Sequence, residues 1–94
     1  MEIQQQDDGH KGSFFIKSEG KKLAEMTYVY SGPGRLIIDH TEVDESLRGQ
    51  KVGNKLLDKV VEMARAKDLK ILPLCPFAKA TLLKNKEAFA DVLV

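Results

Sequence analysis

Apolar and polar side chains alternate most clearly over residues 13–30. The run 13–17 is apolar with two aromatic residues, and a turn-forming stretch, 18–21, follows it. Over residues 23–30, one face is lined by Ala24, Met26, Tyr28 and Tyr30. A period of two is typical of β-strands, so this part of the chain predicts a hairpin.

The pattern changes period in the second half of the chain. Residues 35–43 start apolar on both faces and end polar, which predicts a central strand that leaves the core toward a site. Residues 54–67 carry one apolar stripe and one charged face, as an amphipathic helix does. The apolar run 69–74 predicts a fourth strand, and Pro76 can occupy the first turn of a short helix over 77–84.

These elements predict an α/β (α+β) fold with the order β-β-β-α-β-α. The third strand, the long helix and the fourth strand form a parallel crossover. The polar residues 1–12 are expected to be a weakly ordered lead-in. Residues 13–94 are expected to form a single domain, since a chain of 94 residues builds one thin core. Residues 91–94 fit either a strand or a last helical turn.

Composition excludes several classes of protein. A net charge of +1 provides no strong field for nucleic acid. One cysteine cannot form an internal disulfide, and no zinc cluster is expected. The first eight residues are polar and acidic, unlike a signal or transit peptide, and no apolar run approaches the roughly 20 residues of a membrane span. We therefore expect a cytoplasmic protein without a nucleic-acid, membrane or metal partner.

A basic loop with glycines precedes the long helix. It contains Arg48, Gly49, Lys51 and Gly53. The first turn of a helix has N–H groups without partners, and glycines let a loop bring further N–H groups close to an anion. A phosphate or pyrophosphate fits such a loop. Two glycines also suit an ordinary tight turn, so the loop alone leaves both interpretations open.

The loop sequence 48–53 resembles the pyrophosphate loop of the GCN5-related N-acetyltransferases. The stretches 39–43, 47–50 and 72–79, in this order, are similar to the compact YjdJ-like branch of that family. The resemblance covers residues 13–93 and is more specific than the loop by itself. It implies a minimal fold of the family, a mixed sheet whose two parallel strands splay apart to form a cofactor cleft.

The resemblance also implies acetyl-coenzyme A as the cosubstrate. Its pyrophosphate would lie on the loop, and its pantetheine arm would follow the polar end of the third strand. The implied cofactor-binding residues are Thr41, Glu42, Val43, Arg48, Gly49, Gln50, Lys51, Val52, Gly53, Asn54, Cys75, Phe77 and Lys79. Lys51 replaces a glycine of the family pattern, so it is either strained there or adds a phosphate contact.

Three residues are candidates for catalysis. Cys75 directly precedes Pro76, and a helix N-terminus favours the thiolate form, so this cysteine could accept the acetyl group. The alternative is a buried cysteine that packs as a small apolar side chain. His40 and Glu42 share one face of a strand and are candidate general bases. The alternative is a hydrogen-bonded structural histidine beside a solvated charge.

Many GCN5-related enzymes use a tyrosine late in the chain as general acid, but no tyrosine follows residue 30 here. Two functions therefore stay open. One is transfer of acetyl to an amine of a small molecule or protein, and the other is a module that holds acetyl-coenzyme A without turnover. A nucleic-acid module that uses Lys51, Lys55 and Lys59 is disfavoured by the near-neutral charge.

Overall fold

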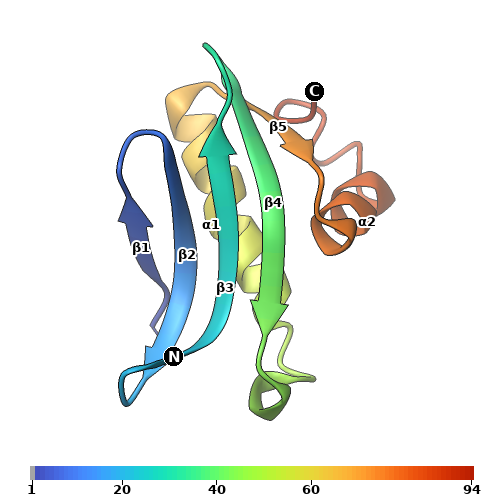
Figure 1. Cartoon of the computed structure of the whole chain (residues 1–94). Coiled ribbons are helices and arrows are strands. Elements are labelled where there is room, and N and C mark those ends of the chain that lie inside the picture. The colour runs from blue at the N-terminus through green and yellow to red at the C-terminus, as the bar shows by residue number, and fades with distance from the viewer. Residues whose placement is uncertain (1) are drawn as a thin grey trace.

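The computed structural model describes residues 2–94, which contain a five-stranded sheet with a long helix behind it (Figure 1). The helix α1 (Val52–Lys67) covers one face, and α2 (Pro76–Lys84) lies beside the last strand. A short 3₁₀ turn, η1 (Glu45–Leu47), leads into the loop before α1. The strands are β1 (Gln4–Asp7), β2 (Lys11–Ser18), β3 (Lys21–Tyr30), β4 (Arg35–Val43) and β5 (Lys70–Pro73). The predicted α/β fold is confirmed.

The strands follow one another across the sheet in chain order. The first four pair antiparallel, and β4 pairs parallel with β5, where Leu36 lies opposite Ile71. Because α1 connects β4 to β5, the predicted parallel crossover is confirmed. The strand predicted over 35–43 has the expected bounds, and the helix predicted over 54–67 begins two residues earlier.

The core lies between α1 and the face of the sheet that it covers. Every second residue of β3, and of β4 as far as Ile38, points into it, as strand alternation requires. Alternating residues of three strands are fully buried against the apolar stripe of α1: Met26, Tyr28, Leu36, Ile38 and Ile71 on the sheet, and Leu56, Val60 and Ala64 on the helix. Each large buried side chain contributes about 1.5–3 kcal/mol, so this single layer provides most of the stability.

The N-terminal segment differs from the prediction. Residues 1–12 were expected to be weakly ordered, but β1 pairs with β2 as an edge strand, so the order is β-β-β-β-α-β-α. The Asp7 carboxylate accepts hydrogen bonds from the hydroxyls of Tyr28 (2.7 Å) and Tyr30 (2.6 Å). Lys67 of α1 donates to the same Tyr30 hydroxyl at 2.9 Å. These polar contacts attach the strand to the rest of the molecule.

The C-terminal tail lies along the free edge of β5. Leu93 forms a parallel bridge with Ile71, and the Val94 N–H donates to the Ile71 carbonyl at 3.1 Å. Val92 is buried in the core, and Asp91 accepts a hydrogen bond from the Arg65 Nε at 2.9 Å. Residues 91 and 92 lie in a turn, in which the Leu93 N–H bonds to the Phe89 carbonyl, and Leu93 forms only a single bridge, so the tail combines both interpretations.

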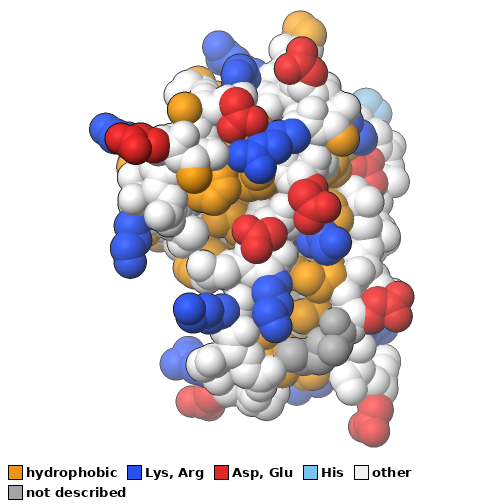
Figure 2. Space-filling view, turned by 180° about the vertical axis from the view of Figure 1, so that it is seen from behind, with side chains coloured by type: hydrophobic (Ala, Val, Ile, Leu, Met, Phe, Trp, Pro, Cys, Tyr) orange, Lys and Arg blue, Asp and Glu red, His pale blue; other side chains and the backbone are white. Residues whose placement is uncertain are grey.

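The far side of the molecule carries both signs of charge. Figure 2 shows this side with lysine, arginine and acidic side chains interspersed over apolar surface. Within residues 2–94, no helix combines the length and the apolar character needed to cross a membrane.

Candidate functional site

Strand β4 is paired on both sides only as far as Ile38. Its last partner on β5 is Pro73, and the N–H groups of Leu74 and Cys75 both donate to the Ile38 carbonyl, at 2.9 and 3.1 Å. Pro73 faces the same edge as Ile71, whose N–H and carbonyl bond to Val92 and Val94, so the missing proline N–H removes no bond to β4. The ladder ends after the Ile38 carbonyl, because no later residue of β5 pairs with β4. Beyond this point β4 runs on to Val43, paired with β3. The two parallel strands therefore separate at their carboxyl ends, where ligands bind in open α/β sheets.

The separated half of β4 presents backbone groups to the opening. The Asp44 N–H donates to the Leu23 carbonyl at 2.6 Å. In an antiparallel ladder, bonded and non-bonded pairs alternate, so Glu42 is bonded to β3 while Thr41 and Val43 are not. The amides of Thr41 and Val43 consequently point away from β3. An extended ligand with its own amide groups can bond to them as another strand would.

The loop before α1 has the backbone conformation of an anion site. Gly49 has φ +84°, and Lys51 is left-handed with φ +55° and ψ +37°. Lys51 is the N-cap of α1 and makes no side-chain capping bond. A left-handed residue followed by helical residues turns successive N–H groups toward one point, which favours an anion there. The strain expected for Lys51 is present, because this conformation costs a non-glycine residue about 1–2 kcal/mol.

Two contacts join β4, α1 and α2 at this opening. Cys75, the N-cap of α2, is 4% exposed, and its Sγ donates to the Thr41 Oγ1 at 3.0 Å. A Cβ added to Gly53, in the first turn of α1, would lie 2.8 Å from the Cζ of Phe77. The structure thus brings together four of the predicted cofactor residues, which are far apart in the sequence.

The other predicted cofactor residues divide into two groups. Val52 is buried in the core, so its backbone alone can face a ligand. The side chains on the surface around the opening are Arg48, Gln50, Asn54 and Lys79. Arg48 and Lys51 carry two positive charges near the N-terminus of α1. Lys79, in the first turn of α2, carries a third positive charge. This charge suits phosphate groups at the surface end of the opening.

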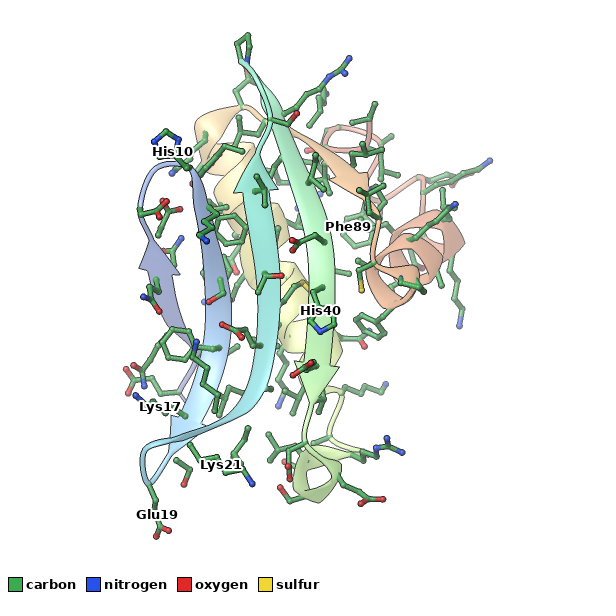
Figure 3. All side chains as sticks on the ribbon, viewed as in Figure 1. His10, Lys17, Glu19, Lys21, His40 and Phe89 are labelled. Atoms are coloured by element: carbon green, nitrogen blue, oxygen red, sulfur yellow. The ribbon has the colours of Figure 1, made fainter. Side chains whose placement is uncertain are left out.

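His40 and Glu42 lie on the outer face of β4, opposite the face that α1 covers (Figure 3). Their side chains are 62% and 74% exposed, and His40 Nε2 lies 2.8 Å from Glu42 Oε1. This hydrogen bond to Glu42 raises the pKa of His40 above its ordinary value. Thr41, between them, faces Cys75 on the inner side. The structure therefore places His40 and Cys75 on opposite faces of β4.

One feature of the outer face was missed from the sequence. Thr27 pairs with His40 while Tyr28 pairs with Ile38, so Asp39 is an extra residue in β4, a β-bulge. The Asp39 carboxylate accepts a hydrogen bond from the Thr27 hydroxyl. The bulge puts two consecutive polar side chains, Asp39 and His40, on one face. The sequence signal for the bulge was the pair of adjacent polar residues, Asp39 and His40, within a strand pattern.

Known proteins share the sequence pattern and the fold described above. A family model described as GCN5-related N-acetyltransferase matches residues 13–92. A GCN5-like protein from Staphylococcus aureus, named as a candidate N-acetyltransferase, is 41% identical, with a TM-score of 0.74 over 99% of this chain and 87% of that one. No curated protein matches the chain.

Two more distant solved structures share the fold. The ribosomal-protein-S18-alanine N-acetyltransferase from Escherichia coli has a TM-score of 0.67 at 14% identity, over 85% of this chain and 54% of that one. The aminoglycoside N-acetyltransferase AAC(6')-Iy in complex with coenzyme A has a TM-score of 0.64 at 13% identity, over 94% and 89%. On the family match and the 41% identity, the chain belongs to the GCN5-related N-acetyltransferase family.

Proposed function

We propose that the protein binds acetyl-coenzyme A and transfers its acetyl group to an amine. The observation that carries this proposal is the outward-facing backbone of Thr41 and Val43, next to the anion-binding conformation at Lys51. The pantetheine arm lies along the open edge of β4, and the pyrophosphate lies on the N–H groups at the start of α1. We also propose that the chain belongs to the compact YjdJ-like branch, on the stretches 39–43 and 72–79.

His40 is the proposed general base. In the tautomer whose Nε2 donates a hydrogen bond to Glu42 Oε1, Nδ1 of the neutral imidazole carries the lone pair. The neutral amine attacks the acetyl carbonyl carbon, the carbon–sulfur bond breaks, and His40 Nδ1 takes the proton that the amine loses. The coenzyme A thiolate takes one proton from solvent and leaves as the thiol, and the protonated His40 returns its proton to solvent. Glu42 orients the imidazole and stabilises its protonated form.

Transfer through Cys75 is a second route to the same product. In it, Sγ first accepts the acetyl group as a thioester, and the amine then attacks that thioester. The 4% exposure of Cys75 and its bond to Thr41 favour the direct route, because Sγ must be released before it can react. Mass spectrometry of the intact protein after incubation with acetyl-coenzyme A separates the two routes. An acetyl group on Cys75 supports the thioester route, and its absence during turnover supports direct attack.

A non-catalytic module for acetyl-coenzyme A is the second candidate function. Tyr28 is fully buried, and Tyr30 is bonded to Asp7 and Lys67 on the far side of the sheet. Neither tyrosine lies at the opening between β4 and β5, so neither can protonate a coenzyme A thiolate there. This observation favours binding without turnover. Release of free thiol that depends on an added amine would contradict that second function.

The test is calorimetric titration with acetyl-coenzyme A, followed by thiol release with a panel of primary amines. We expect saturable binding and amine-dependent turnover. His40→Ala should lower kcat/KM by about 10²–10⁴ with the Kd for acetyl-coenzyme A unchanged. His10→Ala, an exposed histidine in the turn before β2, is the matched control and should behave as the wild type. Absence of acetyl-coenzyme A binding would contradict the proposed function.

A further inference from the structure

The outer face of the sheet has a hollow of about 370 Å³ that the proposed function does not use. It lies over β1 to β4, on the side that α1 leaves open. Its volume is in the range of small-molecule sites, about 300–1,000 Å³. The polar side chains that matter for its chemistry are Asp8, Lys11, Ser13, Glu25, Thr27 and Asp39.

The lining of the hollow is predominantly acidic. Three carboxylates, Asp8, Glu25 and Asp39, face one lysine, Lys11. Burial opposes ionisation of Glu25, but hydrogen bonds from Lys22 and Ser13 hold the pKa of that carboxyl below its ordinary value. The lining thus holds more acidic than basic groups, which attract cations to the hollow.

Hydrogen bonds hold these carboxylates in place. Asp8 Oδ1 accepts from the backbone N–H groups of His10 and Lys11, both at 2.9 Å. Asp39 accepts from the Thr27 hydroxyl through Oδ1. Among the bonds recorded for the described residues, both aspartates use Oδ1, so each can offer Oδ2 to a ligand. Glu25 is bonded to Lys22 Nζ at 2.8 Å, which reduces its share of the field.

The hollow adjoins the proposed general base. Thr27 and Asp39 form its wall on the side of β4, and His40 is both the neighbour of Asp39 and the partner of Thr27 across the sheet. Ser13, which is 5% exposed, lines the hollow opposite Thr27. An amine that enters from the hollow therefore reaches His40 along the outer face of β4, while coenzyme A occupies the opening toward β5.

We propose that this hollow is the acceptor site and that it binds a linear aliphatic diamine or polyamine. The inference rests on the proposed function, whose acceptor it identifies. With Lys22 paired to Glu25, the carboxylates Asp8 and Asp39 are left beside Lys11, a net charge of −1. Each of these two aspartates offers its Oδ2 to a separate ammonium group. The volume of the hollow suits a small flexible amine. One end of the amine lies, deprotonated, at His40, and the remaining ammonium groups pair with Asp8 and Asp39.

The first experiment locates the amine with spermidine as the probe. The ¹⁵N-labelled protein is titrated with spermidine in low salt, and the amide resonances of Ser13, Thr27 and Asp39 should shift. Asp39→Asn should weaken binding by about tenfold, because it removes a charge-assisted partner. Lys11→Ala should strengthen it, because it removes the one opposing charge of the lining. Asp58→Asn, an exposed carboxylate on α1, is the matched control.

The second experiment separates failure of this inference from failure of the proposed function. Asp39→Asn should raise KM for spermidine while the calorimetric Kd for acetyl-coenzyme A stays unchanged. If acetyl-coenzyme A binds but spermidine leaves the resonances of the hollow unmoved, or Asp39→Asn binds it as tightly as the wild type, the acceptor site is wrong. If spermidine binds the hollow and acetyl-coenzyme A does not bind, the amine site stands and the proposed function fails.

Discussion

The two halves of β4 differ in pairing and in burial. The half up to Ile38 is paired on both sides, and Leu36 and Ile38 are fully buried. The half from Asp39 to Val43 is paired with β3 and is mostly polar, with His40 62% exposed. One continuous strand thus serves first as core and then as site. The difference shows that backbone groups become available for binding where a strand extends beyond the end of the neighbouring strand.

Two structural features explain why β4 changes from core to site immediately after Ile38. On one side the pairing with β5 ends at Ile38 and Pro73, and on the other the bulge at Asp39 shifts the register with β3. The first frees the amides of Thr41 and Val43, and the second turns Asp39 and His40 to the outer face. The proposed cofactor site consequently lies at the open edge of residues 39–43, and the proposed acceptor site lies on their outer face.

The largest expected difference between the halves is in stability. Ile38→Ala should lower the free energy of unfolding by about 2–5 kcal/mol, because it leaves a cavity under α1. Thr41→Ala should cost about 1 kcal/mol, since it removes one hydrogen bond with Cys75. Urea denaturation of both variants measures this. Equal losses would contradict the division of β4 into core and site.

Gly53 tests the contact at the border of the open half. Gly53→Val should lower the free energy of unfolding by about 1–3 kcal/mol, because a Cβ meets the Phe77 ring at 2.8 and 3.0 Å. Cofactor binding should be lost as the ring is displaced. In a double-mutant cycle with Phe77→Ala, part of the lost stability should return. If the two changes are additive, the ring is not what excludes a side chain at Gly53.

Lys51 is expected to have a smaller effect. Lys51→Gly relieves a left-handed backbone and should stabilise the protein by up to about 1 kcal/mol. The affinity for acetyl-coenzyme A should change by less than about tenfold, or roughly 1.4 kcal/mol, because the backbone N–H groups stay in place. Lys51→Glu should bind less tightly in low salt. If it binds as well as the wild type, the lysine lies away from the phosphates.

The smallest expected effect is a shift along the pH axis. The hydrogen bond to Glu42 raises the pKa of His40, so the unprotonated base appears only at a pH above the ordinary histidine value of 6.5. In Glu42→Gln that bond loses its charge, and the ascending limb of the kcat/KM profile should move to lower pH. A limb that does not move would exclude His40 as the base.

The apolar periodicity of the sequence was sufficient for α1 and for the strands β2 to β5. These elements bury one face, and burial produces the pattern from which they were predicted. The edge strand β1 was not predicted, since all four of its side chains are exposed. Besides its pairing with β2, it is held by the contact between Asp7 and Tyr28, which are 21 residues apart. No local pattern contains a contact of that kind.

The candidate site was predicted to a similar extent. The family resemblance singled out the loop 48–53 and left two possibilities for Lys51, backbone strain or a phosphate contact. The left-handed backbone of Lys51 agrees with the first. The sequence did not indicate that Gly53 is required by Phe77, or that His40 and Cys75 face opposite ways. Both depend on how β4, α1 and α2 pack together, and the bulge at Asp39 depends on the register between two strands.

The most direct test of the account is a titration of the ¹⁵N-labelled protein with acetyl-coenzyme A, followed residue by residue. We expect saturable shifts at the amides of Thr41 and Val43 and at the start of α1, with little change at Leu36 and Ile37. That result would place the cofactor on the half of β4 that extends beyond β5. An absence of binding, or shifts confined to the doubly paired half, would contradict the account.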